Sequence, residues 1–279
     1  MNGDTPFAVP VLCYHSWMAG GDDYVSNHHV ALKHDLKALA VRGYKVISIP
    51  LLVDILCGRK SARCLGNEKM VGLTFDDGHN LDYVDGTRAR CGSVPSFRSI
   101  LCESRDWLPL IGEGPRAVSF VIVAEEARAA IDSRGGMDDR WWKECAAGGV
   151  IGIANHSWDH AHGSVAVVRQ RENRKDSFLD VDTFDDAEAQ IADAQRLLME
   201  RTDGLALPLF GYPYGHVSAY LRDEYFPVHG ERIGIEAAFG TGGAPVTPDC
   251  SRWDIPRYVC GDHWCSEAGL AQLLSEIRA

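Results

Sequence analysis

Short apolar stretches alternate along the chain with longer segments in which apolar residues recur three or four positions apart. The short stretches predict buried strands at residues 8–14, 45–49, 70–75, 117–123, 150–154 and 207–212. The helical spacing predicts helices at residues 28–42, 51–57, 138–147, 183–201 and 267–278. Because strands that alternate with helices are typical of a parallel sheet, we expect an α/β fold, with one domain over residues 1–279.

Polar residues follow two of the predicted strands at the point where each strand ends. Asp76 and Asp77 come directly after residues 70–75, and His156 closely follows residues 150–154. In a closed α/β barrel the reactive side chains gather at the carboxyl ends of the strands, so we expect these polar groups to lie close together. The segment 161–181 has no clear periodicity and is expected to form a loop beside them.

Pairs of adjacent aspartates are common in this chain, which has four of them. The pair Asp76-Asp77 differs from the others because it follows a buried strand, where both carboxylates are held at a rigid sheet edge. Like charges so close together repel each other unless a cation lies nearby. From this pair alone, a functional role and a plain turn both remain open.

Two histidines have a spacing that suits a shared metal ion. Among the 11 histidines, only His156 and His160 stand four positions apart. This separation places two imidazoles on one side of a helical turn, where they can bind the same ion. A surface or capping role is the alternative for either histidine taken alone.

Composition narrows the classes of function. The 279 residues are 46% hydrophobic, enough for a large core, and the net charge is −11. No dense run of Lys and Arg is present to follow a phosphate backbone, so nucleic acid is not expected as a partner. Nine scattered cysteines lack the close pairing of a zinc ribbon and are expected to be reduced. No apolar segment has the length of a secretory signal or a transmembrane helix, so we expect a cytoplasmic protein.

Three sequence motifs together resemble a known family. Thr-Phe-Asp-Asp-Gly at residues 74–78 and His-Ser-Trp-Asp-His at residues 156–160 resemble, in this order, the first two motifs of the NodB-homology polysaccharide deacetylases, carbohydrate esterase family four. Phe-Gly-Tyr-Pro-Tyr-Gly at residues 210–215 is similar to their third motif. The resemblance implies a single deformed (β/α) barrel that hydrolyses the N-acetyl group of an amino sugar.

The family pattern implies a role for each matching residue. Asp77, His156 and His160 would bind one divalent metal ion, and Asp76 would act as the general base. Zinc is the first expectation, with Co, Ni, Mn and Fe as alternatives, because two neutral imidazoles and one carboxylate leave positions open for water and a carbonyl oxygen. A backbone N–H in the turn that contains Pro213 and Tyr214 would stabilise the oxyanion.

The general acid does not lie where many relatives have it. Those relatives use a histidine near the C-terminus, but the predicted helix 267–278 contains none. Val-Leu-Cys-Tyr-His-Ser at residues 11–16 instead resembles the Tyr-His element of a circularly permuted branch that includes poly-N-acetylglucosamine deacetylases of biofilms. We therefore expect His15 to protonate the leaving amine, with His216 and His263 as alternatives.

The third motif also departs from the family pattern. It usually begins with an Arg that pairs with the base, but this chain has Gly211 in that neighbourhood. Arg257 could supply the missing charge from a later strand, or it could form a plain surface salt bridge. Tyr214, Trp158 and Trp264 are candidates for stacking on sugar rings, with core packing as the alternative for each.

The expected substrate is an N-acetylated saccharide of a bacterial surface polysaccharide or its precursor, such as O-antigen, capsule or exopolysaccharide. It could be presented as a sugar nucleotide or as a lipid-linked saccharide. One alternative is a metal-dependent hydrolase of another C–N bond in a small amide. A second is a saccharide-binding protein that has lost catalysis, because the third-motif Arg and the C-terminal histidine are both absent.

Overall fold

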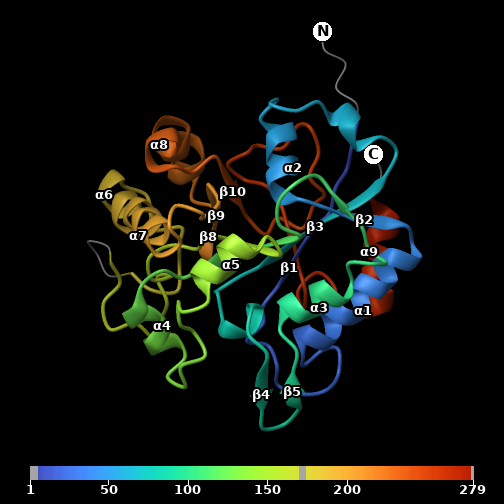
Figure 1. Ribbon diagram of the computed structural model, residues 1–279. Coiled ribbons are helices and arrows are strands. Elements are labelled where there is room, and N and C mark those ends of the chain that lie inside the picture. The colour runs from blue at the N-terminus through green and yellow to red at the C-terminus, as the bar shows by residue number, and fades with distance from the viewer. Residues whose placement is uncertain (1–5, 170–173, 278–279) are drawn as a thin grey trace.

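Parallel strands form the centre of the molecule, and the helices pack around them (Figure 1). The computed structural model describes residues 6–169 and 174–277. Within these ranges nine strands join one sheet, and β4 and β5 form a separate hairpin. The strands are β1 (Val11–Tyr14), β2 (Tyr44–Ile47), β3 (Lys69–Phe75), β4 (Gly86–Arg88), β5 (Gly92–Val94), β6 (Leu110–Ile111), β7 (Ala117–Val121), β8 (Ile151–Asn155), β9 (Leu209–Gly211), β10 (Ala237–Phe239) and β11 (Tyr258–Val259).

The main path of the sheet runs in the order β10-β9-β8-β7-β3-β1-β11, and its strand pairs are parallel. A parallel bridge between Phe239 and Ile255 then joins β10 to the segment that leads into β11. The N–H of Ile255 donates to the carbonyl of Ala238 at 2.8 Å, and the N–H of Gly240 donates to the carbonyl of Ile255 at 2.9 Å. The expected α/β fold with a parallel sheet is confirmed, and these contacts connect its two ends into a deformed barrel.

The helices cover the strands on opposite sides. In Figure 1, α6, α7 and α8 lie on one side of the strands, and α1, α3 and α9 lie on the other. The helices are α1 (His28–Val41), α2 (Ile49–Leu56), α3 (Phe97–Glu103), α4 (Glu125–Ile131), α5 (Trp142–Gly148), α6 (Phe184–Ala187), α7 (Asp193–Arg201), α8 (Phe226–Ile233) and α9 (Glu267–Glu276).

Two predicted helices differ from the observed ones. The helix expected at 183–201 begins as predicted, with the Thr183 side chain accepting the N–H of Asp186, but a π-helical turn at Glu188–Ala192 separates α6 from α7. The helix expected at 138–147 begins only at Trp142. An irregular turn precedes it because Asp138 accepts the N–H of Arg140, a local bond that competes with helix formation.

Strand β3, which carries the first motif, is buried along its length apart from its first residue. Strands of a parallel barrel are covered on both faces, which explains the continuous apolar run. Leu73 and Phe75 pack in the same cluster as the buried side of α1, whereas Met70 belongs to a second cluster with residues of β7. At Gly72 an added Cβ would lie 2.8 Å from Ile49 Cδ1, so this glycine permits close packing of β3 against its neighbours.

Three further observations bear on the expectations from sequence. Residues 161–181 are largely irregular where described, although residues 170–173 lie outside the described residues. All nine cysteines lie in the described part and are free thiols. None of the described helices combines the length and the apolar character needed to cross a bilayer.

The buried side of α1 provides a test of the packing. Leu36 is fully buried, and Val41 on the same helix is 87% exposed. We expect Leu36→Ala to lower the free energy of unfolding by about 2–5 kcal/mol, because the lost methyl groups leave a cavity. Val41→Ala should change it by less than about 0.5 kcal/mol. Urea denaturation of both variants measures the difference, and equal midpoints would contradict the observed orientation of α1.

Candidate metal centre and active site

The candidate residues come from different strands but reach the same end of the barrel. His15 follows β1, Asp76 and Asp77 follow β3, His156 follows β8, and Tyr214 follows β9. The carboxyl ends of parallel strands share one rim, so residues far apart in sequence meet there. A cavity of about 1220 Å³ opens at this rim, and its lining includes His15, Asp76, Asp77, His156, His160 and Tyr214.

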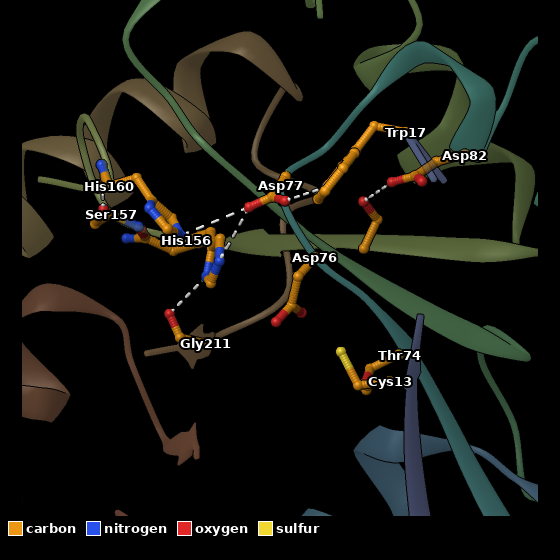
Figure 2. A network of polar contacts seen from close by, with 12 residues as sticks. Cys13, Trp17, Thr74, Asp76, Asp77, Asp82, His156, Ser157, His160 and Gly211 are labelled. Carbon is orange, nitrogen blue, oxygen red and sulfur yellow. Dashed lines mark hydrogen bonds and ion pairs between the residues drawn. The ribbon is translucent and has the colours of Figure 1, made fainter. Parts of the chain in front are cut away.

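Asp77, His156 and His160 converge as a triad of metal-ligand type. Oδ1 of Asp77 lies 3.6 Å from Nε2 of His156 and 3.6 Å from Nε2 of His160. One ligand atom of each residue lies within 4.8 Å of those of the other two. Figure 2 shows both imidazoles on one side of the Asp77 carboxylate. Atoms that bind one zinc ion at about 2 Å each can be at most about 4 Å apart, and the two separations from Asp77 meet this limit.

The orientation of His156 is set by the carbonyl of Gly211. Nδ1 of His156 lies 2.8 Å from this oxygen, which can only accept, so Nδ1 is the donor and Nε2 faces Asp77. An added Cβ on Gly211 would lie 2.8 Å from the Phe120 ring and 3.2 Å from Nδ1 of His156. The residue near the position of the family's Arg therefore has to be small here, because it supports a histidine at close range.

The loop that carries both histidines is not helical, so the expectation of a helical turn is wrong. Residues 156–160 lie outside any helix, and φ is positive at Ser157 (72°) and His160 (61°). Oγ of Ser157 accepts the N–H of His160 at 2.9 Å, and Oδ1 of Asn155 accepts the N–H of Ser157 at 2.8 Å. These side-chain bonds stabilise a tight turn that brings two imidazoles four residues apart onto one side.

The imidazole of His160 is in the state that a metal ligand requires. The side chain is buried, and burial together with the neighbouring His156 lowers the pKa of His160 to about 3. The ring is therefore neutral near pH 7, with a lone pair available for an ion. Its Nδ1 is buried without a hydrogen-bond partner among the described residues.

The charges around Asp77 fit a divalent cation. Burial opposes ionisation of this carboxyl, but the nearby His160, His15 and His156 outweigh burial and hold its pKa below the usual value. No Lys or Arg of the described residues forms an ion pair with Asp77. An ionised carboxylate facing two imidazole nitrogens is a donor set that suits zinc and related ions, so the residues present fit the metal that the motifs imply.

Asp76 has a different partner. Its Oδ1 lies 2.6 Å from Nη1 of Arg257 and its Oδ2 lies 2.9 Å from Nη2, in a bidentate ion pair. Both side chains are buried, so Arg257 does not form a surface salt bridge. Burial raises the pKa of Asp76, but the Arg257 guanidinium more than offsets this effect and keeps the pKa well below its usual range.

His15 lies next to this ion pair. Potential ligand atoms of Cys13, His15 and Asp76 lie within 4.8 Å of one another. A second metal ion there is disfavoured because the guanidinium of Arg257 already occupies both oxygens of Asp76 and its Nη1 lies 3.5 Å from Sγ of Cys13. The backbone N–H of His15 donates to Nδ1 of buried His28 at 3.0 Å, which fixes the residue at the end of β1.

The two alternative histidines and two of the candidate aromatic residues, His216, His263, Trp158 and Trp264, do not line the cavity. Nδ1 of His216 accepts the N–H of Phe178 at 3.4 Å, and Nδ1 of His263 accepts the N–H of Val259 at 2.9 Å.

The structure does not offer either tryptophan to a sugar in the cavity. Trp264 is 3% exposed, and its indole N–H donates to Tyr24 at 2.9 Å and to Asp35 at 3.1 Å. The guanidinium of Arg169 lies 3.8 Å from the centre of the Trp158 ring and covers one of its faces. For Trp264 the alternative of core packing is the correct one. Tyr214 alone of the three lines the cavity, and its ring centre lies 4.3 Å from that of His160.

Trp17 is a site residue that sequence reasoning missed. Its indole N–H donates to Oδ2 of Asp77 at 2.8 Å, across 60 positions of sequence. No motif marks it, and a single tryptophan in a loop has no periodicity that could reveal a contact so far along the chain. Its proximity to His15 in the sequence was the one available signal.

No protein-family model matches this chain, and no curated protein matches it. Solved structures do match, at low sequence identity. A de-N-acetylase from Aggregatibacter actinomycetemcomitans aligns with a TM-score of 0.64 and 16% identity, over 96% of this chain and 100% of that one. The Streptococcus pyogenes deacetylase PplD, solved in complex with acetate, aligns with a TM-score of 0.62 and 16% identity, over 97% of this chain and 99% of that one.

A third solved structure also aligns with almost the whole of this chain. A polysaccharide deacetylase from Bacillus cereus aligns with a TM-score of 0.60 and 17% identity, over 96% of this chain and 69% of that one. At such identities the likeness establishes the fold, and almost the whole of this chain takes part in it. The chain therefore has the fold of the polysaccharide deacetylases.

Proposed function

We propose that the protein is a metal-dependent N-deacetylase that hydrolyses the acetamido group of an amino sugar. The observation that carries the proposal is the arrangement of two adjacent carboxylates in one cavity. Asp77 faces the imidazoles of His156 and His160, and Asp76 faces Arg257. The shared fold and the three motifs support it, and the chain would act as one catalytic domain over residues 1–279.

Asp77, His156 and His160 would hold the ion. A divalent ion held there would supply Lewis-acid polarisation of the amide carbonyl and would lower the pKa of water. Asp76 accepts the proton of the attacking water, and for this it must be ionised. Arg257 keeps it ionised across the neutral range and fixes both of its oxygens, at the cost of making it a weaker base.

His15 would supply the proton that the leaving group requires. Water oxygen attacks the carbonyl carbon, the C–N bond breaks, and the nitrogen takes a proton from His15 to leave as the free amine, with acetate as the second product. The imidazole lines the same cavity as Asp76 and reaches it from β1. Proton acceptor and proton donor therefore come from neighbouring strands, β3 and β1, which pair in parallel register.

The turn after β9 would bind the oxyanion. Pro213 is buried at the start of this turn, and Tyr214 has a positive φ of 59°. This conformation is unusual for a residue with a side chain, and Tyr214 lines the cavity. A backbone N–H at Tyr214 is the donor we propose for the negative oxygen, in the manner of the family's third motif.

For the substrate we propose an N-acetylated saccharide of a bacterial surface polysaccharide or its precursor, presented as a sugar nucleotide or a lipid-linked saccharide. The cavity of about 1220 Å³ extends from the metal centre past β4 and has room for groups beyond one sugar ring. Zinc is the ion we propose. Nine free thiols are typical of a reducing compartment and support the cytoplasm as the location.

Replacing Asp76, the proposed base, distinguishes metal binding from catalysis. We expect Asp76→Asn to retain one equivalent of zinc and to lower acetate release by about 10²–10⁴-fold, the usual contribution of a general base. Catalysis is measured as acetate release from N-acetylglucosamine oligosaccharides and from UDP-N-acetylglucosamine. Metal binding is measured as zinc content by elemental analysis. Asp185→Asn, at the exposed member of another Asp-Asp pair, is the matched control and should behave as wild type. A wild-type protein that binds zinc but releases no acetate would support the alternative of lost catalysis or of another amide substrate.

Removal of the proposed acid should slow the same reaction without affecting the ion. We expect His15→Ala to lower kcat by about 10²-fold or more and to leave the zinc content unchanged. His216→Ala and His263→Ala serve as controls, because neither side chain lines the cavity. Wild-type kcat in His15→Ala would remove His15 from the mechanism, whereas a loss in His263→Ala would point to that residue.

The ion pair of Asp76 predicts a particular dependence of stability on pH. In the wild type the pKa of Asp76 is lowered, so its contribution to stability is present above the ordinary carboxyl pKa of about 4 and is lost as pH falls through the folded pKa. In Arg257→Met the carboxyl stays buried without a cation, its pKa rises, and the buried charge destabilises the protein as pH increases. We expect a loss of about 3–5 kcal/mol at pH 7 that becomes smaller toward pH 4.

Urea denaturation of the metal-free proteins between pH 4 and pH 7 measures this difference. The double variant Asp76→Asn/Arg257→Met is the control, because it has no carboxyl left to titrate at this position. Its stability relative to wild type should vary less with pH than that of Arg257→Met. Parallel curves for the two variants would show that Asp76 does not depend on Arg257 for its charge.

A further inference from the structure

Trp17 is a large aromatic residue that remains half exposed at the wall of the cavity. It lies in the loop after β1, two positions beyond His15, and its side chain is 50% exposed. Its ring lines the cavity together with the candidate metal ligands. Contacts that do not involve the indole hold this loop, because the Met18 N–H donates to the His15 carbonyl at 3.1 Å and the His29 side chain places Nε2 2.8 Å from the Ser16 carbonyl.

The two oxygens of Asp77 have different partners. Oδ2 accepts the indole N–H of Trp17 at 2.8 Å, and Oδ1 faces Nε2 of both His156 and His160 at 3.6 Å. Figure 2 shows the indole on one side of the carboxylate and the imidazoles on the other. The indole N–H donates one hydrogen bond, and the nitrogen has no free lone pair to coordinate a metal ion, so Trp17 competes with no ligand for the ion.

We propose that Trp17 is a positioning residue that leaves Asp77 one oxygen for the metal and holds that oxygen toward the two histidines. This inference rests on the proposed function of the triad. A hydrogen bond to the non-ligating oxygen restricts rotation of the carboxylate and keeps it monodentate. Such a geometry favours a small ion with few ligands, such as zinc, over larger ions that take both oxygens of a carboxylate. Partners of this kind typically contribute a factor of about 10–100 to metal affinity.

The contact also couples the metal ligand to the loop of His15. The rings of His15 and Trp17 lie edge to face, with centres 6.1 Å apart. One short loop therefore contains the proposed proton donor and the side chain that orients a metal ligand from β3. Without the indole bond, Oδ2 of Asp77 would be free to rotate toward the ion, because no other hydrogen bond to this oxygen is present among the described residues.

Zinc affinity of the substrate-free protein tests the proposal. Trp17→Phe keeps an aromatic ring but loses the N–H, and we expect its zinc dissociation constant, measured by competition with a chelator, to rise about 10–100-fold. Trp107→Phe is the matched control, since Trp107 is 41% exposed and does not line the cavity. It should bind zinc as wild type does. The melting temperature of metal-free Trp17→Phe should equal that of the wild type, because the indole is half exposed.

A second measurement reports whether Oδ2 of Asp77 binds the ion once the indole N–H is removed. The visible absorption of the cobalt-loaded protein depends on the number and geometry of the ligands, so it should differ between wild type and Trp17→Phe. Replacing Trp17 with 3-benzothienylalanine keeps the bicyclic shape and exchanges the N–H group for sulfur, which cannot donate a hydrogen bond. This variant separates the loss of the bond from the loss of packing if Trp17→Phe folds poorly. The same loss of affinity is expected for it.

The outcomes distinguish this inference from the proposed function. Equal zinc affinity and identical cobalt spectra in the wild type and both Trp17 variants would overturn the positioning role and leave the deacetylase proposal intact. Failure of the wild type itself to bind zinc would overturn the proposed metal centre. Weaker zinc binding that is accompanied by an equally large loss in Trp107→Phe would show a general effect of tryptophan removal and would also overturn the positioning role.

Discussion

The ion pair between Arg257 and Asp76 is the interaction on which the site depends. Arg257 enters from the segment between β10 and β11, and besides both oxygens of Asp76 it contacts the Gly240 carbonyl at 3.0 Å and Thr74 Oγ1 at 3.2 Å. It thus connects the segment that closes the barrel to the end of β3. A buried pair of this kind adds little net stability over apolar packing, whereas loss of one partner is costly. Its presence beside the cavity is therefore better explained by what it does to Asp76 than by its contribution to the fold.

Backbone strain accompanies the charges at the same rim. Asp77, Ser157, His160 and Tyr214 all have positive φ, between 59° and 75°. Residues with side chains adopt this region at a cost of about 1–3 kcal/mol each, which persists only where surrounding contacts require it. The contacts are visible for the loop after β8, where side chains of Asn155 and Ser157 accept backbone N–H groups. The rigid parallel strands beneath thus hold short loops in conformations that direct polar side chains into the cavity.

The sequence predicted the strands and the convergence of the motifs because both have local signals. Apolar runs mark β3 and β8, and the polar residues at their ends follow from the geometry of parallel sheets. A spacing of four between His156 and His160 predicts a helical turn, but the same spacing also fits the observed non-helical turn. Residues other than glycine that adopt a left-handed conformation cannot be recognised from the pattern of apolar and polar positions. The contact of Trp17 with Asp77 and the burial of Trp264 depend on packing between distant segments. No local property of the sequence reports such packing.

Two adjacent carboxylates on one strand end have become chemically different groups through their partners. The positive φ of Asp77 turns its side chain away from that of Asp76, toward the loop after β8. Asp76 meets a guanidinium, which satisfies both oxygens and repels any further cation. Asp77 meets two imidazoles and an indole N–H, which leave its charge without a fixed countercharge among the described residues. A divalent ion would therefore be attracted to Asp77 and not to Asp76, and in the proposed mechanism proton transfer would fall to Asp76, the carboxylate that the ion leaves free. The division of roles that we propose for the two aspartates would thus follow from electrostatics, with the arginine supplied by the segment before β11.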